Sequence, residues 1–286
     1  MVLIADGGST KADWILLDKS GEQIFKTRTE GLNPAVFSEA LLKSRIEENE
    51  DLTKCKNEVD EVYFYGAGCG TEKPTLLLKS IFESFFTNAK VVVKEDTYAA
   101  AYAVTTKPGM VCILGTGSNS CYFDGENVDV RIASLGYVLM DEASGNYFGK
   151  KLIRDYYYGK MPAELAKKFS EQFNLEADVI KRNIYKEANP NTYLAHFAEF
   201  IFKNEQNTYF NKVLRKGIKE FFKNRILPYK EAKTVPVHFV GSIAYFAKDI
   251  IADVAKYHLI ELGEIVRRPI DGLIEYHRAK IKLEQL

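Results

Sequence analysis

Residues 2–17 read VLIADGGSTKADWILL, which is an apolar run, a loop with two adjacent glycines, and a second apolar run. Short apolar runs bounded by turn residues are typical of buried strands. The same order returns about one small domain later, where the apolar run 110–114 precedes Gly115-Thr116-Gly117-Ser118-Asn119 and a further strand pattern at 120–123. We interpret the repeat as an internal duplication, with Pro108-Gly109 as the boundary between two related halves.

The rest of the chain alternates strand and helix patterns. Further strands are expected at about 23–29, 62–65, 91–93 and 237–240, and helices at about 37–49, 74–86, 98–104, 241–256 and from 268 onward. Strands mixed with crossover helices predict an α/β protein. We expect an N-terminal domain over 1–108 and a C-terminal domain over 109–286. The second domain has a helical insertion at about 142–226, and its last helix could pack back on the first domain.

Composition excludes several classes of protein. The chain has 286 residues, of which 46% are hydrophobic, and its 39 basic and 39 acidic residues give a net charge of +0. This balance offers no electrostatic footprint for nucleic acid or an anionic membrane. No signal-peptide pattern, membrane-length apolar run or C-x-x-C spacing is present, so we expect a cytoplasmic protein with reduced thiols and no nucleic-acid or membrane partner.

The first loop, Asp6-Gly7-Gly8-Ser9-Thr10, has the chemistry of a phosphate site. Glycines let consecutive backbone N–H groups approach an anion, the two hydroxyls add donors, and Lys11 adds a positive charge. Asp6 ends a buried strand, where it would face Mg²⁺ if a nucleotide were bound. The alternative is an ordinary two-glycine hairpin turn beside an exposed aspartate.

The second glycine loop, at 115–119, repeats this chemistry. It is no Walker A loop, because the chain has no G-x-x-x-x-G-K-[ST]. It is also a poor dinucleotide fingerprint, since a strand pattern rather than a helix follows it. Two such loops in corresponding places of two halves could close on a polyphosphate from opposite sides.

Three further positions have both a functional and a structural interpretation. Asp96 ends a strand and begins a helix, so it is either a general base or a helix N-cap. Asp141-Glu142 could bind sugar hydroxyls or metal-bound water, or only favour a helix N-terminus. Gly241-Ser242 could admit an adenine ring, or form only a tight turn.

The order of these segments resembles the phosphate and adenosine segments of the actin-like ATPase superfamily. Within it, the chain is similar to the BadF/BadG-type ATPases and the N-acetylglucosamine kinases related to them. The resemblance implies two ribonuclease H-like domains with a nucleotide cleft between them, ATP and Mg²⁺ as cofactors, and a homodimer as the expectation for the family.

The resemblance also implies roles for individual residues. Asp96 matches the catalytic aspartate, and Asp6 the carboxylate that holds Mg²⁺, usually through water. Residues at three segments would contact the nucleotide, and three others the sugar hydroxyls. The nucleotide set is Gly7, Gly8, Ser9, Thr10, Lys11, Gly115, Thr116, Gly117, Ser118, Gly241 and Ser242, and the sugar set is Asn33, Asn119 and Asp141.

One stretch departs from the pattern of the family. The usual G-W-G-x-x-x-G-D-E-G-S has Leu135 in place of tryptophan, and Met140 and Ala143 in place of glycines. These changes bear on the identity of the sugar more than on phosphate transfer.

The implied function is an ATP-dependent kinase for the C6 hydroxyl of N-acetylglucosamine or a related amino sugar. One alternative is an ATPase that activates a dehydratase or reductase through an iron–sulfur cluster, which needs cysteine ligands. Another is a sugar or nucleotide sensor without turnover.

Overall fold

The computed structural model describes residues 1–8, 10–204 and 207–284 and divides into two compact units. The N-terminal unit comprises Met1–Ala103 together with Arg268–Leu286, and the C-terminal unit comprises Val104–Arg267. The last segment of the chain therefore belongs to the first unit, and the chain passes between the units twice.

The N-terminal unit is built on a five-stranded sheet with the order β3-β2-β1-β4-β5. β1, β4 and β5 are parallel, and β2 and β3 extend the sheet as antiparallel neighbours. Its strands are β1 (Val2–Gly7), β2 (Lys11–Leu17), β3 (Gln23–Glu30), β4 (Glu61–Gly66) and β5 (Lys90–Glu95). Its helices are α1 (Glu39–Glu47), α2 (Glu50–Cys55), α3 (Glu72–Phe85), α4 (Asp96–Val104) and α13 (Pro269–Glu284).

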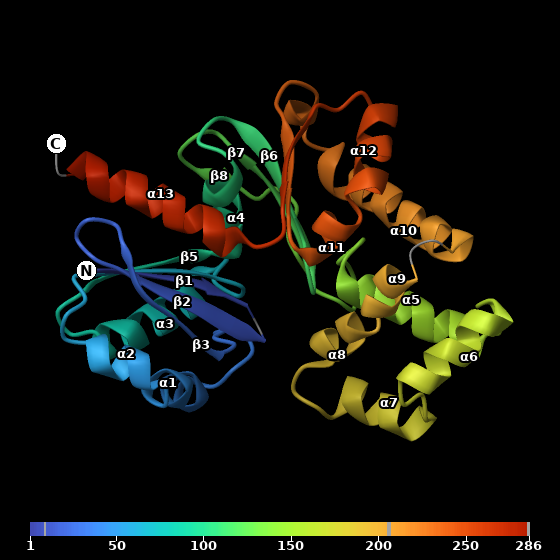
Figure 1. Cartoon of the computed structure of the whole chain (residues 1–286), viewed down its shortest axis with the longest axis horizontal. Helices are drawn as coiled ribbons and strands as arrows, with labels where there is room; N and C mark the ends of the chain where they lie inside the picture. The colour runs from blue at the N-terminus through green and yellow to red at the C-terminus, as the bar shows by residue number, and fades with distance from the viewer. Residues whose placement is uncertain (9, 205–206, 285–286) are drawn as a thin grey trace. The chain divides into compact units, whose positions relative to one another are not determined.

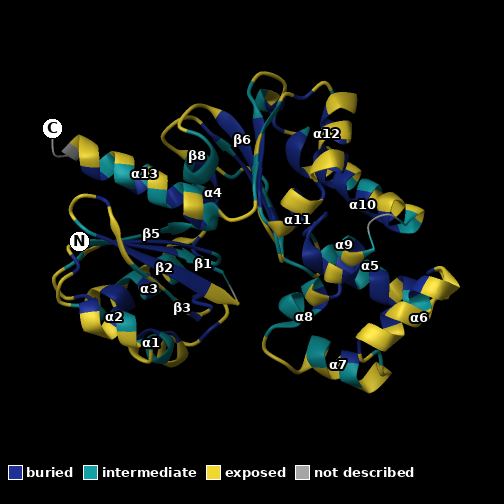
Figure 2. Ribbon diagram, viewed as in Figure 1, coloured by how far each residue is buried: buried dark blue, intermediate teal, exposed yellow. Residues whose placement is uncertain are grey.

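Side chains alternate along each strand, so the apolar strands present hydrophobic residues on both faces of the sheet. Helices cover both of these faces. One face packs Trp14 and Phe64 against Phe82 of α3. The other packs Ile4 and its neighbours against α4 and α13. Burial of each such side chain contributes about 1.5–3 kcal/mol, so α13 is an integral part of the unit. Burial is greatest along β2, which is largely dark blue in Figure 2, whereas most of β3 at the edge of the sheet is exposed.

The C-terminal unit repeats the same sheet, which confirms the predicted duplication. Its order, β8-β7-β6-β9-β10, matches β3-β2-β1-β4-β5, with β6, β9 and β10 parallel and β7 and β8 antiparallel. The strands are β6 (Gly109–Leu114), β7 (Ser118–Phe123), β8 (Val128–Asp129), β9 (Val237–Val240) and β10 (Leu262–Val266).

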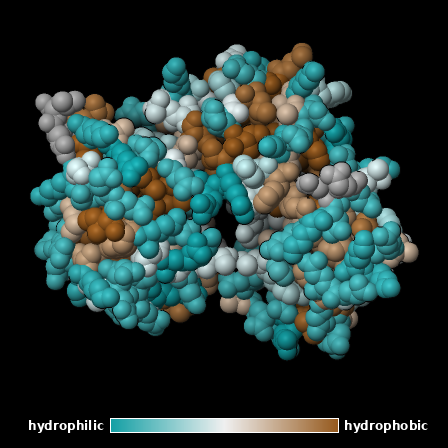
Figure 3. Space-filling view, in the orientation of Figure 1, coloured by the Kyte–Doolittle hydropathy of each residue, from teal (hydrophilic) through white to brown (hydrophobic). Residues whose placement is uncertain are grey.

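Helices fill the sequence between β8 and β9, as the pattern predicts, and two more lie between β9 and β10. They are α5 (Gly145–Tyr157), α6 (Ala163–Gln172), α7 (Ala177–Tyr185), α8 (Pro190–His196), α9 (Glu199–Lys203), α10 (Thr208–Phe221), the π-helix η1 (Phe222–Ile226), the 3₁₀-helix η2 (Lys230–Lys233), α11 (Ser242–Phe246) and α12 (Lys248–Tyr257). Their aromatic residues form one core with the sheet, while hydrophilic residues cover the outer face of α6 (Figure 3).

In this unit one expectation is wrong and one strand was missed. The helix expected over 241–256 is divided at Ala247 into α11 and α12. β10 was not expected, because its residues are half-exposed and lack the apolar run of a central strand. Among the described residues, no helix combines the length and apolar character that a membrane crossing requires.

Candidate active site

Two carboxylates of the N-terminal unit lie at the carboxyl ends of parallel strands. Asp6 is the next-to-last residue of β1, and Asp96 follows β5 as the first residue of α4. β4 lies between these strands, with Gly66 paired to Gly7 on one side and to Glu95 on the other. The carboxyl ends of parallel strands form the edge at which open α/β sheets bind ligands.

Burial and neighbouring carboxylates raise the pKa of both carboxyl groups. The pKa of Asp96 is raised to about 7, first by burial and then by the charges of Glu95 and Asp6. The pKa of Asp6 is raised to about 7 by burial and by Asp13, against the lowering effect of Lys11. A carboxyl group with a pKa near 7 both takes up and releases a proton at neutral pH, as a general base must.

Within the described residues, no ion pair joins Asp6 or Asp96 to a lysine or arginine. The basic groups nearby, Arg28 and Lys11, pair with Asp13 at 2.7 and 3.8 Å. The two carboxyl groups therefore have no directly paired lysine or arginine, which favours a bound cation or a proton.

The first glycine loop is a hairpin turn between β1 and β2. The backbone N–H of Gly8 donates to the carbonyl of Lys11 at 2.8 Å and closes the turn. Thr10 and Lys11 are exposed, and Ser9 lies outside the described residues. A Cβ on Gly7 would collide with the ring of Phe64, so packing requires this glycine. The loop is thus a hairpin turn, but Asp6 beside it is not exposed as the hairpin alternative expects, and phosphate binding by this loop stays a prediction.

A third glycine-rich loop, residues 66–70, lies between Asn33 and Glu95. Gly68 has a φ of 82° and leaves no room for a Cβ beside the Asn33 amide. A Cβ on Gly70 would be 2.8 Å from the Glu95 carboxylate. Asn33 is buried, and its Oδ1 accepts a hydrogen bond from the backbone of Ala35 at 2.9 Å. Sequence reasoning gave this loop no role, although its alternating glycines were visible.

In the C-terminal unit, the second glycine loop is bound to Asp141. The Asp141 carboxylate accepts from the N–H of Ser118 at 3.2 Å and from Nδ2 of Asn146 at 2.7 Å. Nδ2 of Asn146 also donates to the carbonyl of Thr116 at 2.8 Å. A Cβ on Gly117 would lie 3.0 Å from the Asp141 carboxylate. Asp141 therefore lies beside the second glycine loop and also helps to hold it in place.

The segment Gly241-Ser242 lies against the strand that precedes this loop. Gly241 has a φ of 123°, and a Cβ there would collide with the backbone of Leu114. Ser242 is exposed at the start of α11. The predicted adenosine segment and the second glycine loop thus meet at the carboxyl ends of β9 and β6, which are adjacent parallel strands.

Asn119 is buried in β7, where its Oδ1 accepts from the N–H of Ser120 at 2.9 Å.

The predicted site residues fall into one group in each unit. The first group is Asp6, Gly7, Gly8, Thr10, Lys11, Asn33 and Asp96, and the second is Gly115, Thr116, Gly117, Ser118, Asn119, Asp141, Gly241 and Ser242.

The stretch that departs from the family pattern has an unusual backbone. Asp141 and Ala143 have φ angles of 70° and 58°, in the left-handed region that glycine adopts without strain. Leu135 is 56% exposed, and the sulfur of Met140 contacts the guanidinium of Arg225 at 3.2 Å. Sequence reasoning missed Arg225, because a single arginine in a helical pattern normally points to solvent.

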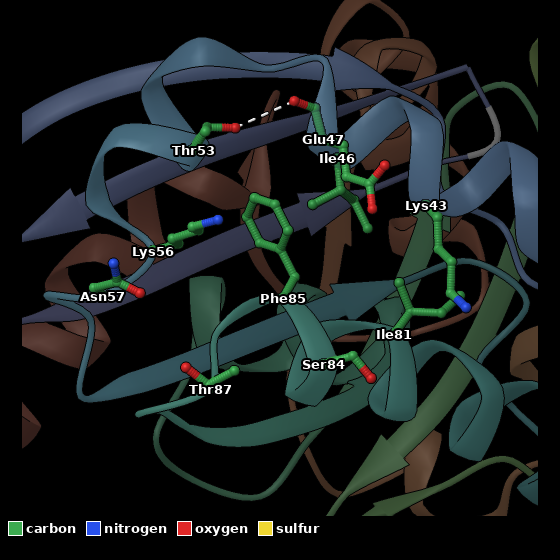
Figure 4. Close-up of a pocket in the computed structure, with 10 residues that line it drawn as sticks. All are labelled: Lys43, Ile46, Glu47, Thr53, Lys56, Asn57, Ile81, Ser84, Phe85 and Thr87. Atoms are coloured by element: carbon green, nitrogen blue, oxygen red, sulfur yellow. Dashed lines mark hydrogen bonds between the residues drawn. The ribbon is translucent and has the colours of Figure 1, made fainter.

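A surface pocket of about 390 Å³ lies apart from these residues, among α1, α2 and α3 (Figure 4). The ring of Phe85 stands at its centre, near Lys56 and Ile46. None of the predicted site residues lines it.

Comparison with known proteins identifies the fold first. A glucokinase of the ROK family from Streptomyces griseus, solved in complex with glucose and AMPPNP, aligns with a TM-score of 0.65 at 14% identity, covering 96% of this chain and 97% of the other. No protein-family model matches the chain. The architecture is thus the two-domain α/β fold of sugar kinases.

Two proteins are more similar in sequence. A proposed N-acetylglucosamine kinase from Porphyromonas gingivalis is 31% identical with a TM-score of 0.91, and the alignment covers 98% of this chain and 99% of that one. The curated N-acetyl-D-glucosamine kinase of Dictyostelium discoideum is 28% identical over 164 residues, which is 52% of this chain and about half (51%) of that protein. The chain belongs to the N-acetylglucosamine kinase family.

Proposed function

We propose that the protein is an ATP-dependent kinase that phosphorylates the C6 hydroxyl of N-acetylglucosamine or a closely related amino sugar. The observation that supports this most directly is the environment of Asp96, a carboxyl group with a pKa of about 7 and no cationic partner among the described residues. Similarity to kinases named for this sugar supports the choice of acceptor.

Asp96 would accept the proton of the acceptor hydroxyl. The hydroxyl oxygen then forms a bond to the γ-phosphorus, and the bond from that phosphorus to the β–γ bridging oxygen breaks, so that ADP leaves. Such reactions depend on positioning and on stabilisation of charge rather than on covalent chemistry by the protein.

Asp6 suits a magnesium site of the kind that nucleotide enzymes use. Its carboxylate is an oxygen ligand without a paired cation, and burial beside Asp13 raises its pKa. No group of three or more His, Cys, Asp or Glu residues in the described chain could hold a metal. Mg²⁺ at Asp6 would therefore take most of its ligands from nucleotide and water, and it would neutralise charge on the phosphate oxygens.

The glycine loops would bind the phosphates of the nucleotide. In the described structure, the N–H groups of Thr116 and Gly117 have no acceptor, so both are available to an anion. Gly241 and Ser242 would contact the adenosine, and Asn33, Asn119 and Asp141 the hydroxyls of the sugar.

The cysteines are poorly suited to the cluster-dependent alternative. All four are free and buried, and Cys112 and Cys121 lie inside the sheet of the C-terminal unit. An iron–sulfur cluster shared between subunits needs thiolates at a surface.

The test is ADP release from Mg-ATP with N-acetylglucosamine, glucosamine, N-acetylmannosamine, N-acetylmuramic acid and glucose. We expect strong stimulation by one N-acylated amino sugar and little by glucose. ADP release that no sugar stimulates would contradict the proposal and favour an ATPase or a sensor.

A further inference from the structure

Arg225 is a buried arginine of the C-terminal unit, with 1% of its surface exposed. It belongs to η1, a single π-helical turn that follows α10 directly, with the N–H of Leu227 donating to the carbonyl of Phe222 at 2.9 Å. π-Helical turns are rare in proteins, and this one forms the C-terminal end of α10.

The guanidinium of Arg225 binds both ends of segment 132–142, which is the stretch that precedes and includes Asp141. Nη1 donates to the carbonyl of Ile132 at 3.0 Å, and Nη2 contacts the sulfur of Met140 at 3.2 Å. Nε lies 3.6 Å from the carboxylate of Glu142. Asp141 is therefore flanked on both sides by residues that the same guanidinium holds.

The backbone of Arg225 reaches the second element of the site. Its carbonyl accepts a hydrogen bond from the hydroxyl of Ser120 at 2.9 Å, and Ser120 follows Asn119 in β7. Asn224, the neighbour of Arg225 in η1, donates to Glu142 at 3.0 Å. One turn of π-helix thus fixes the surroundings of two residues that we propose contact the sugar.

The chemistry of arginine suits this task. Its planar group presents five N–H donors in a fixed fork, whereas lysine offers a single point of charge on a flexible chain. Met140 stands where the family pattern has glycine, and its sulfur accepts a contact from Nη2 of Arg225 that a glycine could not provide. Two of the residues that depart from the pattern, Leu135 and Met140, belong to the segment that Arg225 contacts.

We infer that Arg225 is a positioning residue for the acceptor sugar, acting through segment 132–142 and Asp141. This inference rests on the proposed kinase activity. The second glycine loop is also held by the start of α5, where the N–H groups of Gly145 and Asn146 donate to the carbonyls of Gly115 and Thr116 at 2.8 and 3.0 Å, independently of Asp141 and Arg225. Loss of the Arg225 guanidinium should therefore displace Asp141, the proposed sugar contact, more than the second glycine loop, the proposed nucleotide contact.

The experiment compares the full-length Arg225→Lys variant with the wild type. KM for the sugar, KM for ATP and kcat are measured with whichever sugar stimulates ADP release most. We expect KM for the sugar to rise about tenfold, the factor that corresponds to one lost hydrogen bond to the sugar, with KM for ATP and kcat changed less than about threefold. Arg215→Lys is the matched control, because Arg215 lies in α10 and pairs at the surface with Asp253.

Met140→Leu is a second variant, which keeps Arg225 paired with Glu142 and changes the core volume little. It should raise KM for the sugar in the same direction by a smaller factor. Amide hydrogen exchange in the Arg225→Lys variant should increase across segment 132–142 but not in α12. A purely structural arginine would alter stability without separating the two KM values.

Equal increases in both KM values, or a loss of kcat at constant KM for the sugar, would overturn the inference while leaving the kinase intact. A wild-type protein that no sugar stimulates would overturn the proposed function and this inference together. Unchanged exchange over 132–142 would show that Arg225 does not hold the segment.

Discussion

Asp96 is the residue on which the proposed chemistry depends most. Replacing it with asparagine preserves its size while removing the base. We expect Asp96→Asn to bind ATP normally and to lower kcat by about 10²–10⁴-fold, the usual contribution of a general base. ATP binding by calorimetry and ADP release with the best sugar test this, and near-normal turnover would remove Asp96 from the mechanism.

Glu95 sets the pH range in which Asp96 can act. After burial, the charge of Glu95 is the largest cause of the raised pKa of Asp96. Only the ionised carboxylate accepts a proton, so kcat/KM should fall as pH drops below about 7. Glu95→Gln lowers the pKa of Asp96 and should move this decline to lower pH.

The measurement is the pH profile of kcat/KM in the Glu95→Gln variant and in Glu72→Gln, which changes an exposed carboxylate at the start of α3. The profile of Glu72→Gln should match the wild type. Coincident profiles for all three proteins would show that Glu95 has no influence on the base.

At the scale of single elements, α12 ends in a strained residue. The N–H of Leu259 donates to Lys256 and that of Ile260 to Ala255, the paired bonds of a Schellman motif, which usually has glycine at this position. Leu259 instead has a φ of 56° with 84% of its surface exposed. Its side chain therefore adds strain and almost no packing.

Leu259→Gly should stabilise the protein. The left-handed conformation costs a residue with a Cβ about 1–2 kcal/mol, and the added chain entropy of glycine offsets about 0.5–1 kcal/mol of that gain. We expect an increase of about 0.5–1 kcal/mol in the free energy of unfolding, measured by circular dichroism in urea. Leu259→Ala keeps the strain and should change little, and a less stable glycine variant would be the contrary result.

The contact between α13 and its sheet contains a buried histidine. Nε2 of His277 and the hydroxyl of Tyr65 are 3.0 Å apart, and burial, with a smaller effect of Lys280, lowers the pKa of His277 to about 3. In the unfolded chain the pKa returns to about 6.5. Between these values the unfolded state binds the extra proton, so stability is complete above pH 6.5 and is lost as the pH falls.

The wild type should lose about 1.4 kcal/mol per pH unit from this group below pH 6.5. His277→Gln retains a hydrogen-bonding side chain and does not titrate, so the difference in unfolding free energy between the two proteins should shift with that slope from pH 6 to pH 4. Fluorescence of Trp14, the single tryptophan of the chain, reports unfolding of this unit. A difference that is constant with pH would contradict the prediction.

The strands of this protein could be predicted from the sequence more completely than the surroundings of the candidate site. Apolar runs such as Val2–Ala5 and Val237–Val240 were correctly predicted as strands, because burial on both faces leaves a signal that needs no context. The duplicated sheet followed from the repeated glycine loop. The half-exposed β10 had no such signal.

The surroundings of the candidate site were less visible. The positive φ of Asp141 and the inward direction of Arg225 arise from a segment and a π-turn that pack on one another, and neither has a local pattern. The raised pKa of Asp96 depends on Asp6, which is remote in sequence and close only through the pairing of β1, β4 and β5. Sequence indicates the residue types, and tertiary contact determines their charge states.

At the scale of the whole molecule, the two units differ in continuity. The C-terminal unit is one segment, Val104–Arg267, whereas the N-terminal unit needs α13 to cover Ile4 and Tyr65. The isolated fragment 104–267 should therefore unfold cooperatively in urea.

Truncation after residue 267 should destabilise the N-terminal unit selectively. Without α13, one face of its sheet is no longer covered by Ile270 and Leu273. Burial of each of these side chains contributes about 1.5–3 kcal/mol to stability. Trp14 fluorescence should then change at much lower urea than in the full chain, while the C-terminal unit is unaffected. A truncated protein with the Trp14 transition of the full chain would show that α13 is dispensable.

The ribosome synthesises the chain from its N-terminus, so α13 is made after the rest of the unit to which it belongs. A nascent chain normally folds its first domain first, but here the first unit lacks one of its covering helices until Pro269–Glu284 has been synthesised, after the whole second unit. The second unit has all of its residues earlier, so we expect the order of folding to invert the order of translation. The half-built first sheet, with an apolar face uncovered, is then the species that a chaperone would meet during each round of protein synthesis.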